Sequence, residues 1–511
     1  MLDTMEETVA AVSAAEERFE LWRARIGSFA GPILALMIYV FTPGLPPAQR
    51  RLGAILTLVI VYWISEAIPI PATALLGPVL CVLFGVGDAE KVFRSFGNPI
   101  IFVFLGGFLI ARAMTATALD RRASLAVLRS RVIGSSPERV RIAMGLVSTV
   151  MSMWISNTAT AAILLPIAIG IGNAFDRLYA GKGEEERRAR GFVTGMLLMV
   201  AYGASIGGLG TPIGTPPNLI GIGMLERMAQ RRITFFDWMT LGVPIVIVMF
   251  LLMVALTHFL HRPPSRRIEG LHEALVSIEK GVPAWGWPQT VALVSFLSAV
   301  ALWVLPGVAA IAFGRDSGIF MFLEHRLQEG AVAVFAASLL FLLPVSWNPV
   351  RGVLSWREAV EIDWGTILLF GGGLSLGELL SETGLAARLA QGFLSLEGSR
   401  DLWVITAGAG LFSLLITETT SNTAAASMVV PLGIAVAQGA GVSPVPPALA
   451  ATIGASLAFV LPVSTPPNAI AYGTGRVPIL KMVRAGIGLD ILCYLALLLL
   501  LRILCPRLGL L

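Results

Sequence analysis

Long apolar stretches follow one another from about residue 27 to the end of this chain, and they predict a bundle of membrane helices. Each holds about 20 residues, the length that an α-helix needs to cross the hydrocarbon core of a bilayer. We expect about eleven spans. They fall near residues 27–43, 52–69, 71–87, 98–115, 191–225, 236–260, 286–306, 328–346, 363–380, 443–475 and 484–504.

Two further apolar segments, 142–173 and 402–437, differ from these spans because each is polar at its centre. Both centres hold the same triplet, which is Ser156, Asn157 and Thr158 in the first segment and Ser421, Asn422 and Thr423 in the second. Each segment is too long for one simple crossing, so we interpret each as a re-entrant hairpin with the triplet at its tip. Such irregular backbone is tolerated only where protein or a water-filled cavity surrounds it.

The order of elements predicts an inverted repeat. Five spans separate the two hairpins, and because five is odd, the second hairpin enters from the opposite membrane face. Segments 104–128 and 370–394 resemble each other, since each is a glycine-rich span followed by an amphipathic helix. Downstream, segments 203–223 and 454–475 both break at Thr-Pro-Pro-Asn. Inverted repeats with discontinuous helices are typical of secondary transporters, whose site lies near the bilayer midplane.

Composition supports an all-α, polytopic membrane protein. Of 511 residues, 56% are hydrophobic and 14% are charged, whereas a soluble chain carries about 25% charged residues. The net charge of +5 does not indicate nucleic acid binding. The three cysteines and four histidines form neither a disulfide framework nor a metal-ligand set. No nucleophile–base constellation is visible, so we expect neither an enzyme nor an organic cofactor.

The basic residues favour a cytoplasmic N-terminus, as the positive-inside rule requires, and we expect a bacterial inner membrane. Residues 1–26 lack the plan of a cleavable signal peptide, and we expect a short amphipathic helix there at the cytoplasmic face. The expected division is an amphipathic segment at 1–26, scaffold helices of the first repeat at 27–139, its transport part at 140–260, a cytoplasmic connecting loop at 261–285, scaffold helices of the second repeat at 286–400 and its transport part at 401–511.

Each hairpin tip can serve both a cation and an anion. A helix that ends near Trp154 directs free carbonyls toward the membrane centre, and a helix that begins after the triplet directs free N–H groups there. Ser, Asn and Thr are favourable N-caps for the second helix. The alternative is that the triplets are hydrogen-bonding contacts between helices. Two copies at opposed tips, each followed by a broken span, favour a binding site.

The broken spans supply the other wall of this site. The segments Gly214–Asn218 and Ser464–Asn468 each hold two consecutive prolines, which a helix cannot run through. The freed carbonyls need a partner, and a sodium ion is a plausible one. No Lys or Arg occurs within 142–173, 191–225 or 401–475. An anion would therefore be held by dipoles, hydroxyls and co-bound cations, which favours cation-coupled uptake.

Glu418 is the one ionisable residue deep in a hairpin. Two interpretations stay open, a hydrogen bond within the hairpin and a proton or cation role of the kind that buried membrane acids often have.

With these paired motifs, the chain resembles the divalent-anion/sodium symporter family, which carries dicarboxylates, citrate or sulfate and includes the INDY-type transporters. The resemblance covers nearly the whole chain from about residue 27. It implies a homodimer whose protomers have eleven spans and two re-entrant hairpins. It also implies a scaffold domain that dimerises and a transport domain that slides as an elevator.

The resemblance further implies the ligands of two sodium ions. The first ion would bind Ser152, Ser156, Asn157 and the Gly214 carbonyl, and the second Thr417, Asn422 and the Ser464 carbonyl. Ser464 stands where the family pattern suggests alanine, but its carbonyl is retained. The substrate-binding residues implied are Ser156, Asn157, Thr158, Thr215, Pro216, Ser421, Asn422, Thr423, Thr465 and Pro466.

The function expected is sodium-coupled symport of C4-dicarboxylates such as succinate, malate or fumarate. Alternatives within transport are a sodium-independent dicarboxylate exchanger and a citrate or sulfate carrier. Two alternatives belong to a different class, namely an anion channel and a non-transporting receptor. A channel would show flux without sodium dependence or saturation. A receptor would need a soluble output domain, and no segment is long and polar enough to form one.

Overall fold

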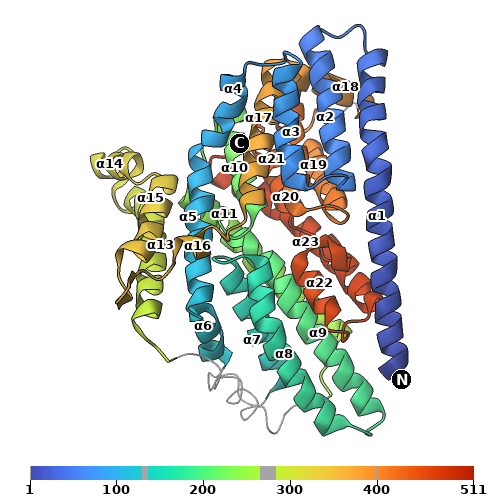
Figure 1. The fold of residues 1–511 in the computed structure, drawn as a ribbon, viewed down its shortest axis with the longest axis vertical. Coiled ribbons are helices and arrows are strands. Elements are labelled where there is room, and N and C mark those ends of the chain that lie inside the picture. Colours follow the sequence, from blue (N-terminus) through green and yellow to red (C-terminus); the bar gives the residue numbers. More distant parts are fainter. Residues whose placement is uncertain (1, 129–135, 265–283, 398–399) are drawn as a thin grey trace.

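The computed structural model describes residues 2–128, 136–264, 284–397 and 400–511, and helices dominate it (Figure 1). The elements up to residue 260 are α1 (Leu2–Phe41), α2 (Pro47–Ser65), α3 (Ile70–Leu83), α4 (Ala89–Phe93), η1 (Arg94–Gly97), α5 (Pro99–Ala116), α6 (Leu119–Leu128), α7 (Pro137–Ser152), α8 (Asn157–Tyr179), α9 (Glu184–Gly207), η2 (Gly208–Gly210), α10 (Pro216–Ala229) and α11 (Phe235–Leu260).

The later elements include one small β-hairpin and otherwise helices. They are α13 (Trp287–Phe313), α14 (Gly318–Arg326), α15 (Glu329–Leu342), β1 (Ser346–Trp347), β2 (Val350–Arg351), α16 (Trp356–Ala359), α17 (Trp364–Glu382), α18 (Leu385–Glu397), α19 (Leu402–Thr417), α20 (Asn422–Ala440), α21 (Val445–Gly454), η3 (Pro462–Ser464), α22 (Pro466–Gly473) and α23 (Ile479–Arg507). The antiparallel pair β1–β2 joins α15 to α16.

Membrane helices make up most of the fold. Within the described residues, eight helical segments are long and apolar enough to cross a bilayer, and four shorter apolar helices accompany them. Among the shorter ones are α3, α15 and α21, each of which covers part of a longer span expected from the sequence. Exposed leucine, isoleucine and phenylalanine side chains cover the apolar part of α1, whereas the corresponding part of α9 is wholly buried. The chain is a multi-pass membrane protein with α9 at its centre.

Two of the expected segment boundaries fall elsewhere in the structure. The amphipathic helix expected at 1–26 is continuous with the first span, because α1 runs from Leu2 to Phe41 with Pro32 inside it. The boundary expected after residue 139 falls inside α7, whose first residues are Pro137 and Glu138. Residues 265–283, most of the expected loop at 261–285, lie outside the described residues.

Both triplet segments are helical hairpins. α7 and α8 meet at the first triplet, and α19 and α20 meet at the second. Figure 1 shows α7 and α8 in one half of the molecule along its long axis and α19 and α20 in the other. The broken spans follow, with α9 giving way to α10 and α21 giving way to α22.

The contacts between helices repeat in the two halves. α7 and α8 pack on α9 as α19 and α20 pack on α21, and α5 packs on α15 as α17 packs on α3. The segments after the two breaks are exchanged between the halves. α10 packs against α20 and α21 of the second half, and α22 packs against α8 and α9 of the first. The exchange brings both breaks to the middle of the molecule.

Candidate functional site

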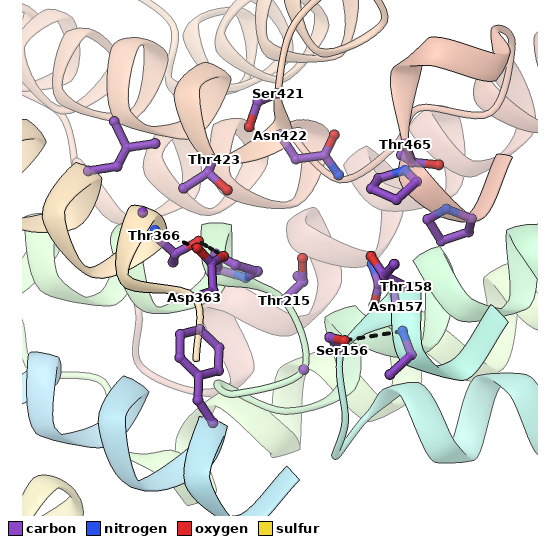
Figure 2. Close-up of a pocket in the computed structure, with 18 of the residues that line it drawn as sticks. Ser156, Asn157, Thr158, Thr215, Asp363, Thr366, Ser421, Asn422, Thr423 and Thr465 are labelled. Carbon is purple, nitrogen blue, oxygen red and sulfur yellow. Dashed lines mark hydrogen bonds between the residues drawn. The ribbon is translucent and has the colours of Figure 1, made fainter. Parts of the chain in front are cut away.

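A cavity of about 1280 Å³ lies between the two hairpin tips and the two breaks. All ten residues predicted to bind substrate line it, and they are Ser156, Asn157, Thr158, Thr215, Pro216, Ser421, Asn422, Thr423, Thr465 and Pro466. Figure 2 shows the two triplets on opposite sides of this space, with Thr215 between them. Residues that are far apart in sequence therefore share one site, although their binding roles remain predictions.

The first tip is built by local helix capping. Ser156 is the N-cap of α8, and its Oγ accepts a hydrogen bond from the Ala159 N–H at 3.2 Å. One turn before the tip, the buried Ser152 donates from Oγ to Asn157 Oδ1 at 2.7 Å. This bond fixes the orientation of the Asn157 amide. Ser156 and Thr158 remain exposed to the cavity.

The second tip repeats the asparagine but not the cap. Thr417 donates from Oγ1 to Asn422 Oδ1 at 2.8 Å, and the same hydroxyl lies 2.7 Å from the Ala455 carbonyl oxygen. Ser421 is the N-cap of α20, yet its side chain makes no capping hydrogen bond. Each asparagine is therefore held by a hydroxyl from the preceding helix, as Ser152 holds Asn157.

The asparagine of each Thr-Pro-Pro-Asn motif ties the broken backbone together. Asn218 donates from Nδ2 to the carbonyls of Gly208 and Thr211, both at 2.8 Å. Asn468 donates likewise to the carbonyls of Ala458 and Leu461, at 3.0 and 3.1 Å. Both side chains are fully buried. A break leaves carbonyls without helical partners, and one amide satisfies two of them in each half.

A hydroxyl also joins each break to the adjacent hairpin tip. In the first half, Thr211 donates from Oγ1 to the Met153 carbonyl. In the second, Ser464 lies with its Oγ 3.0 Å from the Glu418 carbonyl oxygen and 2.7 Å from Glu418 Oε2. The other oxygen, Oε1, accepts from the Val460 N–H at 3.2 Å. Glu418 is thus hydrogen-bonded to the second break, whereas the sequence predicted a hydrogen bond within its own hairpin.

Charged groups also line the cavity. The cations Arg23 and Arg112 face it together with Glu66, Glu361 and Asp363. Each cation is already paired. Arg23 binds Glu66 at 2.9 Å and the Thr419 carbonyl at 2.8 Å, and Arg112 pairs with Glu361.

Asp363 is the N-cap residue of α17. Its carboxylate accepts from the N–H of Thr366 at 3.0 Å and from the hydroxyl of the same residue (Figure 2). The neutral tips are therefore the part of the wall suited to a free anion.

The predicted sodium ligands fall into two groups. Asn157, Asn422, Ser156, Gly214 and Ser464 line the cavity. Ser152 and Thr417 are fully buried behind the tips and act on the asparagines.

Sequence reasoning assigned no role to Asn218 and Asn468, to the cavity-lining Arg23 and Arg112, or to Asp490. The asparagines were visible as the last residue of each break motif. Asp490 was visible as an acid inside the last apolar span, whereas nothing local marks the two arginines.

Three comparisons place the chain among known proteins. Residues 25–511 match the family described as the sodium:sulfate symporter transmembrane region. The chain is 33% identical over 490 residues to the sodium-dependent dicarboxylate transporter SdcS of Staphylococcus saprophyticus, which covers 94% of this chain and 91% of that protein. It is also 33% identical over 470 residues to an uncharacterized transporter of Haemophilus influenzae, covering 90% and 93% of the two chains.

Among solved structures, the chain is similar to the YdaH transporter of Alcanivorax borkumensis. The TM-score is 0.54 at 13% sequence identity, and the match covers 90% of this chain and 99% of that one. At this identity the likeness concerns the fold alone, and it agrees with the mostly helical architecture described above.

Proposed function

This chain belongs to the sodium:sulfate symporter transmembrane family, and on that premise we propose that it is a secondary transporter that couples the uptake of C4-dicarboxylates such as succinate to sodium. The relative from Staphylococcus saprophyticus carries the name of a sodium-dependent dicarboxylate transporter. Sodium is co-transported cargo in this proposal.

The observation that carries the proposal is the meeting of both triplets and both breaks in one cavity. Asn157 and Asn422 each have their Oδ1 fixed by a hydroxyl behind the tip. Each Oδ1, with the carbonyls of the adjacent break, offers oxygen ligands for sodium. The N–H groups that begin α8 and α20 face the same space and favour a carboxylate. Two sodium sites flanking one dicarboxylate give charge balance without a free Lys or Arg.

We propose an elevator mechanism acting on an inverted repeat. The hairpins and broken helices form the moving transport part, while helices such as α1 and α5 form the scaffold that dimerises in the membrane. Arg23 of α1 holds the Thr419 carbonyl beside the second tip, so sliding of that tip past α1 breaks this bond. The N-terminus is cytoplasmic in this proposal, and the membrane is a bacterial inner membrane.

The test is uptake of labelled succinate, citrate and sulfate into proteoliposomes that contain the purified protein, with and without an inward sodium gradient. We expect saturable succinate uptake that requires sodium. Succinate uptake unaffected by sodium but stimulated by internal succinate would identify an exchanger. Sodium-driven uptake of sulfate or citrate in preference to succinate would replace the proposed substrate.

A further inference from the structure

Two carboxyl groups face each other behind the second break. Glu418 lies at the C-terminal end of α19, and Asp490 lies in the middle of α23. Both acids lie at the same part of the break, because Glu418 accepts from the Val460 N–H and Gly486, one turn before Asp490 on α23, packs against the backbone of Phe459 and Val460. Asp490 is only 5% exposed. Neither of its carboxylate oxygens has a hydrogen-bond partner among the described residues.

The surroundings of the pair do not balance its charge. Glu418 already accepts from Val460 and Ser464. Tyr202 of α9 is close to both acids, but its hydroxyl lies 3.2 Å from the Met482 carbonyl oxygen instead. Two adjacent carboxylates repel each other strongly in a medium of low dielectric constant. A cation bound between the two carboxyls or a proton shared by them relieves this repulsion.

The first half lacks such a pair at the matching positions. Met153 stands three residues before its triplet serine, as Glu418 does in the second half. In α11 and α23, the glycines Gly242 and Gly486 pack against the backbone of the adjacent break. Four residues later the two helices carry Val246 and Asp490, respectively. Two apolar residues in one half are thus replaced by two acids in the other.

We propose that Glu418 and Asp490 form a third binding site for a transported sodium ion. This inference rests on the proposed sodium symport. The pair supplies carboxylate oxygens at the carbonyl end of α19, the kind of helix end that coordinates sodium in discontinuous transporter helices. Ser464 links the pair to the transport cavity, because its hydroxyl contacts Glu418 while the residue itself lines that cavity. An ion bound there moves with the second hairpin and break, and it adds one positive charge to each transport cycle.

The first test measures the charge moved per succinate in proteoliposomes. Labelled succinate flux is recorded at imposed membrane potentials, and the potential of zero net flux is compared between wild type, Asp490→Asn, and the double variant Asp490→Asn with Glu418→Gln. Three sodium ions with one dianion move one net positive charge, so wild-type flux should depend on voltage. The double variant should be electroneutral. Tyr202→Phe is the matched control and should keep the wild-type voltage dependence.

The second test counts bound ions without transport. Binding of radioactive sodium to the purified full-length protein should saturate at three ions per protomer in wild type and at two in Asp490→Asn. Saturation of wild type at two ions would overturn the proposal even if no variant folds. A fall in transported charge with an unchanged sodium count would also overturn it, because the pair would then carry a proton.

Failure of this inference is distinguishable from failure of the proposed function. If wild-type succinate uptake does not depend on sodium, both the proposed symport and the third sodium site are contradicted. If uptake depends on sodium but Asp490→Asn and the double variant keep the wild-type charge per succinate, only the third site is lost.

Discussion

Met153 and Glu418 occupy matching places at the tips of two hairpins that share one backbone plan. In both halves an asparagine of the triplet is held from behind by a hydroxyl, and a second asparagine satisfies two carbonyls of the break. Around Glu418, however, the second half adds Ser464 and Asp490. The first half has Gly214 at the position of Ser464 and Val246 at that of Asp490. The backbone plan is repeated while the charge is not, so under the proposed function the two halves would contribute equally to substrate binding and unequally to ion binding.

The largest effects should fall on the shared asparagines. Asn157→Ala and Asn422→Ala each remove an oriented oxygen at a tip, and we expect each to lower sodium-driven succinate uptake by about 100-fold, at the upper end of the losses measured when metal-site residues are changed. Uptake in proteoliposomes provides the measurement, with size-exclusion chromatography as the control for folding. Near-normal uptake in both variants would show that the triplets serve helix packing.

The next largest effect should be a loss of apparent sodium affinity that differs between variants of the two breaks. A Cβ at Gly214 would lie 2.5 Å from the Gly208 carbonyl oxygen, so Gly214→Ala must move the backbone whose carbonyl we propose as a ligand of the first sodium ion. We expect roughly a tenfold loss of apparent sodium affinity, because about 1.4 kcal/mol of lost binding free energy is a factor of ten. The matched variant Ser464→Ala keeps the second carbonyl and loses only a hydroxyl, so its loss should be smaller. Equal losses would contradict this distinction.

The break asparagines should contribute equally to stability. Asn218→Ala and Asn468→Ala each leave two carbonyls of a break without their donor, and we expect each to lower the free energy of unfolding by about 2 kcal/mol, because an unsatisfied buried group costs roughly 1–3 kcal/mol. Thermal unfolding of the purified protein measures this effect. A much larger loss in one half would mean that one break depends less on its asparagine.

The smallest effect should be on stability, and it should differ between the serines of the two triplets. Ser156 caps α8 through its side chain, whereas Ser421 makes no such bond to α20. Ser156→Ala should therefore destabilise the protein by about 1 kcal/mol, the usual contribution of an N-cap, and Ser421→Ala by less. Thermal unfolding without sodium or substrate compares the two. A larger loss for Ser421→Ala would show that its role at the tip exceeds that of a cap.

Sequence patterns predicted the elements that depend on local chemistry. Apolar runs marked the spans, and paired prolines marked the start of α10 and α22. The triplets marked the starts of α8 and α20, although each helix begins at the asparagine of its triplet and not after the threonine. Family membership was predicted from the same motifs and is confirmed.

Features that depend on tertiary contact were beyond these patterns. The pairing of Glu418 with Asp490 joins helices far apart in the chain, and the cavity-facing position of Arg112 follows from how α5 packs. The continuity of α1 was missed for another reason. A change from polar to apolar residues near residue 26 was interpreted as a boundary, but a helix can cross that change without a break.

The exchange of α10 and α22 between the halves has a consequence for biogenesis. When the ribosome has completed α10, its packing partners α20 and α21 have not yet been synthesised. Likewise the surface that α8 and α9 share stays uncovered until α22 has been synthesised. The first hairpin must therefore persist in the lipid as an unfinished intermediate, as larger proteins commonly do during folding. Quality-control proteases and insertases would meet this species, so truncation after residue 400 should yield a chain that is degraded rather than a stable half-transporter.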